Sequence, residues 1–121
     1  MWSQDIHTIR ITVSELILER DVDAILHSFS GITGGTALEG LDKATCASKG
    51  LKGGVVRLIY LMAFIVPEGL LAKDLRPQSL GSFWSTTTYA AWRDIPTTYI
   101  LCTKDKPTTV GFARRLVDAA N

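Results

Sequence analysis

The sequence predicts an α/β fold in which helices flank a three-stranded parallel sheet. Three short apolar runs, rich in β-branched residues, alternate with segments of helical periodicity. Strands separated by helices imply right-handed crossovers and therefore parallel strand pairing. The length of 121 residues fits one domain of about 100–200 residues, so residues 1–121 are expected to form a single domain.

The first half of the chain is expected to hold two helices and one strand. Residues 22–27 form a short apolar run that fits a strand buried on both faces. Residues 32–41 predict a glycine-containing helix, which indicates close packing against the sheet. Residues 43–54 are polar and contain glycine, so we expect a surface loop there. Residues 5–20 predict an amphipathic helix, because their apolar side chains recur at spacings of three and four: Ile6, Ile9, Val13, Leu16 and Ile17.

The second half is expected to add two strands and three helices. Residues 55–62 are the strongest strand candidate because they are rich in β-branched and aromatic side chains. Residues 97–102 predict the third strand. Between these strands we expect a short helix at residues 70–75 and a longer one at residues 82–92. Residues 108–120 predict a closing helix whose inward side chains are Val110, Ala113, Leu116 and Val117.

Composition and charge argue against several classes of protein. The 13 Lys and Arg residues and 12 Asp and Glu residues leave a net charge of +1, which gives no basic field for nucleic acid. The longest apolar run, residues 55–66, is interrupted by Arg57 and falls short of the roughly 20 residues of a membrane span. No apolar leader follows Met1, so we expect no signal peptide and a cytoplasmic location. Because Cys46 and Cys102 lack metal-binding spacing, we expect neither a metal nor another cofactor.

The clearest chemical signal is the serine at the end of the first expected strand. Residues 26–31 read Leu-His-Ser-Phe-Ser-Gly between a strand and a helix, which is the setting of the nucleophile elbow G-x-S-x-G. Side chains two positions on either side of the nucleophile must be small, because they press against neighbouring backbone. Ser28 meets this condition at Ser30 and departs from it at Leu26. Ser30 as the nucleophile would place Ile32 two positions later, so Ser28 is the better candidate.

Three sequence blocks resemble the fungal and plant-type α/β-hydrolase family of small esterases and hydroxynitrile-lyase relatives. The blocks are DVDAILHSFSG, KGGVVRLIYLMAFIVPEG and TTYAAWRDIPTTYILCTKD, and the resemblance extends over residues 5–120. It implies a partial α/β-hydrolase core with Ser28 as the nucleophile. It further implies that the amide of Phe29 donates to the oxyanion and that Asp105 is the acid of the catalytic triad. Fungal members carry a bulky residue where Leu26 stands.

The resemblance covers the middle of the family fold. The strands that precede the elbow helix in the family, the second oxyanion donor and the catalytic His have no counterpart in these residues. The cap-like segment, at about residues 63–95, is also shorter than a family lid. Neither histidine is expected to act as the base, because His27 precedes Ser28 on a strand and so points to the opposite face, and His7 lies on the first helix. We therefore expect a truncated α/β-hydrolase domain, and whether it is an enzyme stays open.

The candidate residues also have plain structural interpretations. Ser28 at the start of a helix is also typical of an N-cap, and Asp105 in a loop is typical of a solvated turn residue. His27 without a second ligand at useful spacing is more typical of a packed or half-buried side chain than of a metal ligand. An aromatic cluster either lines a substrate pocket or packs the cap onto the sheet, and its members are Phe83, Trp84, Tyr89 and Trp92.

Two functions from different classes follow. The first is a serine esterase or related hydrolase that acts on a small ester or acyl compound, and the resemblance implies a role in fungal secondary metabolism. The second is a catalytically inactive hydrolase remnant that binds partners or forms homo-oligomers through exposed sheet edges. A cyclase or isomerase on the same scaffold, independent of Ser28, is a third alternative. Neither nucleic acid nor a membrane is expected as a partner.

Overall fold

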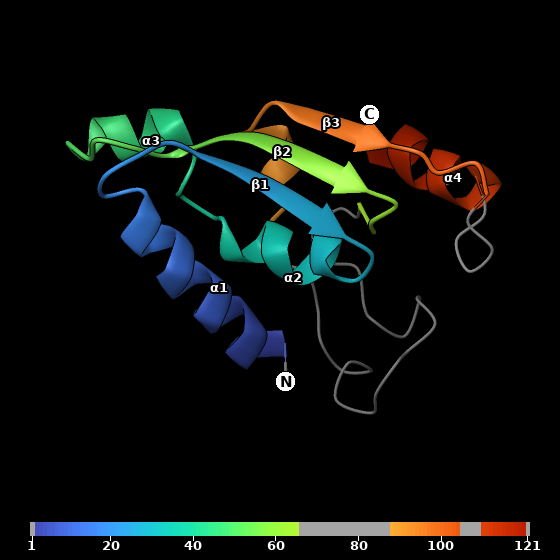
Figure 1. The fold of residues 1–121 in the computed structure, drawn as a ribbon, viewed down its shortest axis with the longest axis horizontal. Helices are drawn as coiled ribbons and strands as arrows, with labels where there is room; N and C mark the ends of the chain where they lie inside the picture. Colours follow the sequence, from blue (N-terminus) through green and yellow to red (C-terminus); the bar gives the residue numbers. More distant parts are fainter. Residues whose placement is uncertain (1, 66–87, 105–109, 121) are drawn as a thin grey trace.

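The computed structural model describes residues 2–65, 88–104 and 110–120 of the chain (Figure 1). Its elements run in the order α-β-α-α-β-3₁₀-β-α. They are α1 (Trp2–Leu16), β1 (Val22–His27), α2 (Ser30–Ala37), α3 (Lys43–Ser48), β2 (Val55–Leu61), η3 (Ala91–Arg93), β3 (Thr97–Ile100) and α4 (Val110–Ala120).

The three strands form one parallel sheet in the order β1-β2-β3. The central strand β2 pairs with β1 through Leu26 and Tyr60, and with β3 through Tyr60 and Tyr99. The rings of Tyr60 and Tyr99 stack, with centroids 6.1 Å apart and an angle of 6° between the ring planes. The predicted α/β fold with a three-stranded parallel sheet is therefore confirmed.

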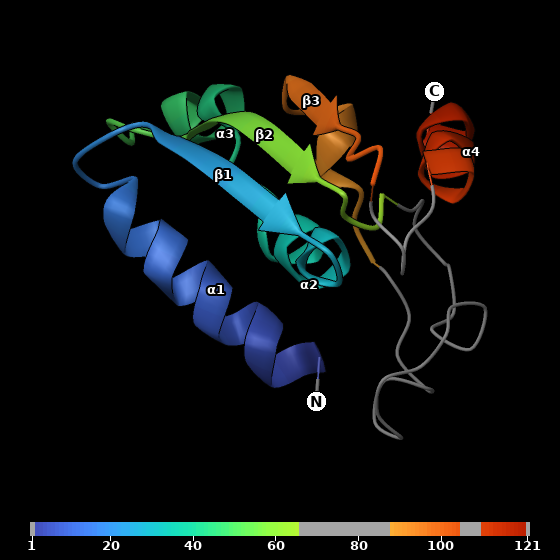
Figure 2. The same ribbon diagram turned by 45° about the vertical axis from the view of Figure 1, so that its right-hand side comes forward.

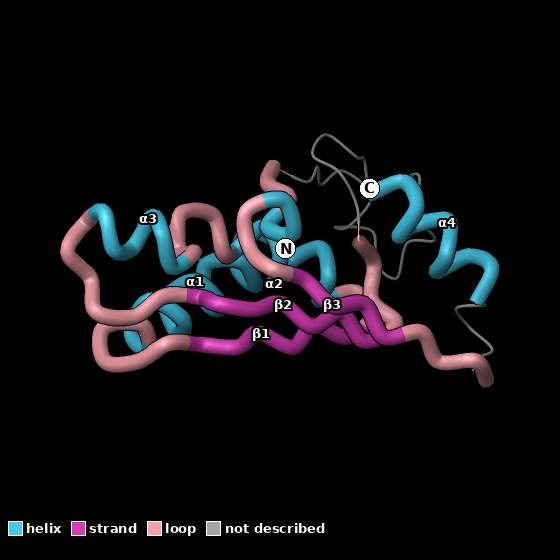
Figure 3. The backbone as a smooth tube through the Cα atoms, turned by 90° about the horizontal axis from the view of Figure 1, so that it is seen from above, coloured by secondary structure: helices cyan, strands magenta, loops and turns pink. Residues whose placement is uncertain are grey.

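The helices of the described chain lie on one side of this sheet (Figure 3). Side chains alternate in burial along β1, where Leu26 is buried while Ile25 and His27 are exposed. The expectation of a strand buried on both faces is therefore wrong. The apolar run predicted two-sided burial, but the described helices cover only the face that carries Leu26, Leu58 and Tyr60.

The main core lies between the covered sheet face and the helices, and α1 runs alongside α2 (Figures 1 and 2). The sheet contributes Leu26, Leu58 and Tyr60 to this core. Ile17, the residue that follows α1, is also buried in it. Helix α1 ends four residues before the predicted boundary at residue 20. The amide of Gly53 donates to the Ile17 carbonyl at 2.9 Å, so this carbonyl bonds to a neighbouring segment instead of to a further turn of the helix. Further core residues come from the segments around α2 and α3: Leu38, Leu41 and Cys46.

The expected surface loop at residues 43–54 is partly wrong, because α3 occupies its first half. Asp42 has extended backbone angles and its carboxylate accepts a 3.0 Å hydrogen bond from the amide of Thr45. This is an N-cap, which satisfies one of the amides left unbonded at a helix start. The polar composition of the segment concealed a helix whose main local signal is Asp42.

The helix expected at residues 82–92 is also not found where the chain is described. Residues 88–90 are not helical, and only η3 follows, as a short 3₁₀ turn. The side chain of Tyr89 donates to Asp94 at 2.6 Å across this turn, and Pro96 cannot continue a helix. Residues 82–87 and the helix expected at 70–75 lie outside the described residues.

Strand β3 ends two residues before the predicted boundary at residue 102. Its partner β2 ends at Leu61, and the next residue, Met62, has a φ of 40° that turns the chain away. Residues 101–102 therefore have no residue of β2 to pair with. In α4, the predicted inward side chains Leu116 and Val117 do pack against the core, whereas the side chains of Val110 and Ala113 are not among those described.

In the parts of the chain that the structure describes, no helix combines the length and the apolar character needed to cross a bilayer.

Candidate active site

Ser28 lies in the turn between the carboxyl end of β1 and the start of α2, at a φ of 53°. A residue with a Cβ rarely adopts this left-handed region, because its side chain crowds the backbone. Among the non-glycine residues that the structure describes, Ser28 shares a positive φ only with Met62. The sequence therefore folds locally into a strained turn that carries a serine at its apex.

Backbone hydrogen bonds hold this turn in place. The Ser28 carbonyl accepts from the amide of Gly31 at 3.2 Å and from the amide of Phe64 at 3.0 Å. The Ser30 hydroxyl spans the other side of the turn, since it accepts from the His27 amide and donates to the His27 carbonyl, each at 2.7 Å. The turn is thus tied both to the end of β1 and to the segment that follows β2.

Two glycines of α2 make the close approach of this turn possible. A Cβ on Gly31 would lie 2.2 Å from the Phe64 carbonyl oxygen, so only glycine fits against that backbone. A Cβ on Gly34 would lie 2.6 Å from Cδ2 of Leu26. The bulky residue two positions before Ser28 is therefore accommodated by a missing side chain on the facing helix. Leu26 departs from the strict elbow motif, and the glycine that leaves room for its side chain stands six residues after Ser28. The glycines of this segment were the sequence signal for such close packing.

The hydroxyl of Ser28 does not cap the helix. The N-cap residue of α2 is Phe29, which makes no side-chain cap hydrogen bond. With respect to the described residues, the Ser28 hydroxyl makes no hydrogen bond, and the side chain is half-buried. The plain interpretation of Ser28 as a helix cap is therefore wrong, since Phe29 stands at the N-cap position instead.

Of the other two predicted site residues, Phe29 and Asp105, only Phe29 lies in the described part of the chain. Phe29 directly follows Ser28 and stands at the start of α2, so its amide lies at the positive end of the helix. Asp105 lies outside the described residues. The residues before it, Cys102 to Lys104, are exposed and follow β3. Because parallel strands end at the same edge of a sheet, this segment leaves β3 at the edge where Ser28 leaves β1.

The structure does not bring either histidine to the Ser28 hydroxyl. His27 is exposed and lies with Asp23 and Ile25 on the face of the sheet opposite to the side chain of Leu26. His7 is exposed on α1, where it lines a shallow surface groove formed by α1 and the turn after it. Among the described residues, no group of three or more His, Cys, Asp or Glu side chains is arranged to hold a metal ion.

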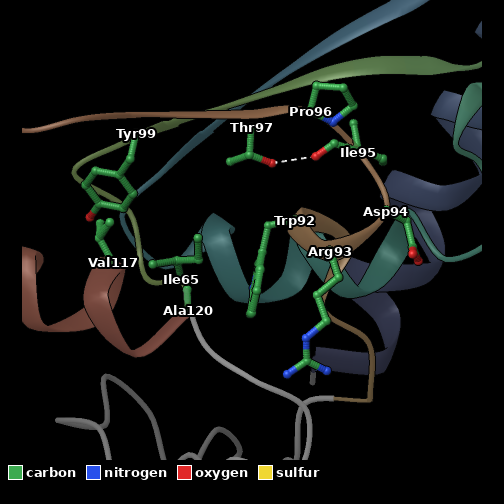
Figure 4. Close-up of a pocket in the computed structure, with 10 residues that line it drawn as sticks. All are labelled: Ile65, Trp92, Arg93, Asp94, Ile95, Pro96, Thr97, Tyr99, Val117 and Ala120. Carbon is green, nitrogen blue, oxygen red and sulfur yellow. Dashed lines mark hydrogen bonds between the residues drawn. The ribbon is translucent and has the colours of Figure 1, made fainter.

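A cavity of about 660 Å³ lies between β3, η3 and α4, and Ser28 is not one of its lining residues (Figure 4). The Trp92 ring projects into it, and the guanidinium of Arg93 lies 4.9 Å from the centre of that ring. Of the aromatic cluster expected from the sequence, Trp92 lines this cavity. Phe83 and Trp84 lie outside the described residues. The lining residues are Ile65, Trp92, Arg93, Asp94, Ile95, Pro96, Thr97, Tyr99, Val117 and Ala120.

The cavity and the serine turn are connected through one short segment. The Tyr99 hydroxyl, at the cavity wall, donates to the Ala63 carbonyl at 2.5 Å. The next residue, Phe64, donates its amide to the Ser28 carbonyl. Residues 63–65 therefore bind to both β3 and the turn. The sequence alone did not indicate the part played by Tyr99, because its partner lies 36 positions away.

Comparison with known proteins gives one relative. No family model matches the chain, and no solved structure matches it. The chain is similar to a curated protein named alpha/beta hydrolase nvfD from Aspergillus novofumigatus (strain IBT 16806), with 28% identity over 151 residues. The match covers 86% of this chain and 60% of the relative, so the chain spans about 60% of the length of the curated protein it matches. The resemblance to fungal α/β hydrolases is confirmed, because the curated protein that this chain is similar to is a fungal alpha/beta hydrolase.

Proposed function

We propose that the chain carries the nucleophile of a serine hydrolase of the esterase type, which acts on a small ester or related acyl compound. The Ser28 oxygen attacks the acyl carbon while a base accepts its proton, and the oxyanion that forms is stabilised by the amide of Phe29. Loss of the alcohol leaves an acyl-Ser28 ester. Water then attacks this ester, releasing the acid and restoring the hydroxyl. Asp105 is proposed to orient the base.

The observation that carries this proposal is the φ of 53° at Ser28, between a parallel strand and a helix. Backbone strain at a single residue costs on the order of 1–3 kcal/mol and is common at sites that work on ligands. A strained, half-buried serine that caps nothing is more simply explained as a nucleophile than as a structural turn residue. The homology to an α/β hydrolase points to the same chemistry.

We propose that the group that accepts the Ser28 proton lies outside the described residues. Neither His7 nor His27 lies at the Ser28 hydroxyl, and a serine needs an adjacent base to react at neutral pH. The aligned stretch of the relative is 151 residues long, although only 86% of the 121 residues take part, so the relative contains segments without a counterpart here. A base supplied from outside the given residues would complete the site. A cytoplasmic setting and a role in fungal secondary metabolism belong to the same proposal.

Covalent labelling with a fluorophosphonate probe tests this proposal. Such probes phosphonylate an activated serine, and peptide mass spectrometry identifies the residue that carries the adduct. Because the base is proposed to lie outside the described residues, the probe is added both to the purified chain and to a cell extract that contains it. We expect an adduct on Ser28 in the extract that the Ser28→Ala substitution abolishes. Ser48→Ala is the matched control, because Ser48 is an exposed serine whose hydroxyl donates to the Thr45 carbonyl on α3. Absence of an adduct at Ser28 both in the extract and in a folded purified sample would exclude serine hydrolysis by the chain.

The second candidate is a non-catalytic module that associates through its sheet. The observation that favours it is the exposed apolar side of the sheet, where Ile25 is 66% exposed. Association through the strand edges is the form that the sequence predicts, since both β1 and β3 are edge strands among the described strands. The labelling experiment separates the two candidates, because the module requires no reactive serine.

A further inference from the structure

Two peptide units lie in series between the side chain of Tyr99 and the oxyanion donor proposed above. The Tyr99 hydroxyl donates to the Ala63 carbonyl at 2.5 Å. The N–H of that same peptide unit belongs to Phe64, and it donates to the Ser28 carbonyl at 3.0 Å. The Ser28 carbonyl in turn shares a peptide unit with the amide of Phe29. We call this series, from the Tyr99 hydroxyl to the Phe29 amide, the hydrogen-bond chain.

We infer that Tyr99 is a positioning residue that acts through the hydrogen-bond chain on the amide of Phe29. The inference rests on the proposed function, in which this amide stabilises the oxyanion. A trans peptide unit is planar, so its N–H points away from its C=O. A donor that fixes the Ser28 carbonyl therefore also fixes the direction of the Phe29 amide. The Tyr99 hydroxyl fixes the Phe64 amide in the same way, through the Ala63 carbonyl.

The hydrogen-bond chain also strengthens its last donor. A hydrogen bond to the carbonyl of a peptide unit polarises the whole unit and makes its N–H a better donor. Bonds in series therefore reinforce one another, by about 10–30% per bond. The charge that develops on an oxyanion is the charge that such a preorganised donor stabilises most. The Tyr99 hydroxyl accordingly improves both the direction and the strength of the Phe29 amide.

The surroundings of Tyr99 hold its hydroxyl in one place. Tyr99 is the register partner of Tyr60 on the neighbouring strand, and the planes of the two stacked rings differ by only 6°. The Tyr99 ring is half-buried and extends from β3 into the wall of the cavity (Figure 4). Packing locks the rotamer of a side chain in such a position, and a locked rotamer is what a positioning residue requires.

The turn at Ser28 depends on this support because its backbone is strained. A residue in a sparsely populated conformation persists only where the surrounding structure over-determines it. The local bond from the Gly31 amide to the Ser28 carbonyl is 3.2 Å long, and the bond from the distant Phe64 amide adds to it. Loss of the Tyr99 hydroxyl is therefore expected to let the turn relax, which moves the Ser28 hydroxyl and the Phe29 amide together.

Tyr60 provides the matched control for removal of the Tyr99 hydroxyl. Its ring stacks on that of Tyr99, and its hydroxyl is buried without a hydrogen-bond partner among the described residues. Tyr60→Phe and Tyr99→Phe therefore remove the same atom from neighbouring positions. Only Tyr99→Phe breaks the hydrogen-bond chain.

Nuclear magnetic resonance of the purified variants tests the hydrogen-bond chain itself. In Tyr99→Phe we expect the amide protons of Phe64 and Phe29 to move upfield. Exchange of the Phe64 amide should become faster by about fivefold, which corresponds to one ordinary hydrogen bond. The amide of Leu58 in β2 should exchange at its wild-type rate, which verifies the fold. If Tyr60→Phe and Tyr99→Phe give the same shifts and exchange rates, the inference is wrong.

The rate of fluorophosphonate labelling, in the purified chain and in the extract, tests the consequence for Ser28. The Ser28 oxygen attacks phosphorus, the base takes its proton, fluoride leaves, and the phosphonyl oxygen occupies the oxyanion position. Loss of a whole oxyanion donor costs about 100–1000-fold in rate, so we expect a weakened and displaced Phe29 amide to slow labelling of Tyr99→Phe by about tenfold relative to Tyr60→Phe.

The labelling outcomes separate this inference from the proposed function. Equal labelling rates for Tyr99→Phe and Tyr60→Phe, with wild type labelled, would overturn the inference and leave the proposed function standing. A wild-type chain that is never labelled would remove the proposed function, and the inference with it, whatever the spectra show.

Discussion

The side chain of Leu26 occupies the space that is left because Gly34 has no side chain. Cδ2 of Leu26, on β1, lies 2.6 Å from the point where a side chain on Gly34 would begin. Leu26 is 7% exposed, so it fills this space within the core. The small residue therefore lies on the helix instead of on the strand, and this leaves room for Leu26 two positions before Ser28.

A double-mutant cycle measures this relationship. Gly34→Ala gains about 1 kcal/mol of helix propensity but overpacks against Leu26, which costs about 1–3 kcal/mol, so we expect a net loss of unfolding free energy. Leu26→Val removes both Cδ atoms. In that background Gly34→Ala should become stabilising, because only the helix propensity remains. Equal effects of Gly34→Ala in the two backgrounds, measured by urea unfolding, would show that the residues are not coupled.

The strain at Ser28 predicts an inverted preference between alanine and glycine. At a φ of 53°, a Cβ costs about 1–2 kcal/mol, whereas glycine has no such penalty. We therefore expect Ser28→Gly to be more stable than Ser28→Ala by about 1 kcal/mol, measured by thermal or urea unfolding. Both variants should lose the fluorophosphonate adduct.

Ser14 on α1 provides the control for this comparison. In a helix interior alanine is more stable than glycine by about 1 kcal/mol, so the order of the two variants should be the reverse of that at Ser28. The same order at both positions would mean that Ser28 is not strained.

The N-cap of α3 predicts a dependence of stability on pH. Burial acts to raise the pKa of Asp42, but hydrogen bonds from the side chain and amide of Thr45, with the charge of Lys49, outweigh it and hold this pKa below its ordinary value of 3.8. A carboxyl group with a lowered pKa in the folded state binds its proton more readily when unfolded. Its contribution to stability is therefore complete above pH 3.8 and is lost as the pH falls through the folded-state pKa.

Asp42→Asn isolates the part of this contribution that depends on charge. The amide oxygen of Asn still accepts from the amide of Thr45, so the variant keeps the cap but loses the charge. We expect wild type to be more stable by about 0.5–1 kcal/mol at neutral pH and the difference to shrink in acid. Urea unfolding at a series of pH values measures it, and a difference that does not change with pH would contradict the assignment.

The local features of the fold were predictable from the sequence because short-range chemistry produces them. The runs at residues 22–27 and 55–61 have the β-branched composition that makes strands, and the helical segments between them require parallel pairing. The position of Ser28 followed from the same local pattern of strand, turn and helix. Helix α3 was not predictable from the composition of residues 43–54, because their polar residues and glycines are typical of a loop and only the cap at Asp42 indicates a helix.

Tertiary structure alone decided which face of the sheet is buried and how the turn at Ser28 is supported. The composition of β1 suited burial on both sides, yet the described helices all pack on the side of Leu26 and leave Ile25 exposed. Whether Leu26 could stand two positions before Ser28 depended on Gly34, and the support of the turn at Ser28 depended on the amide of Phe64. Periodicity and propensity act between neighbours in the chain, whereas burial and close approach depend on residues brought together from distant positions. The sequence by itself therefore determined the elements and the candidate serine, and the packing of distant segments decided the environment of both.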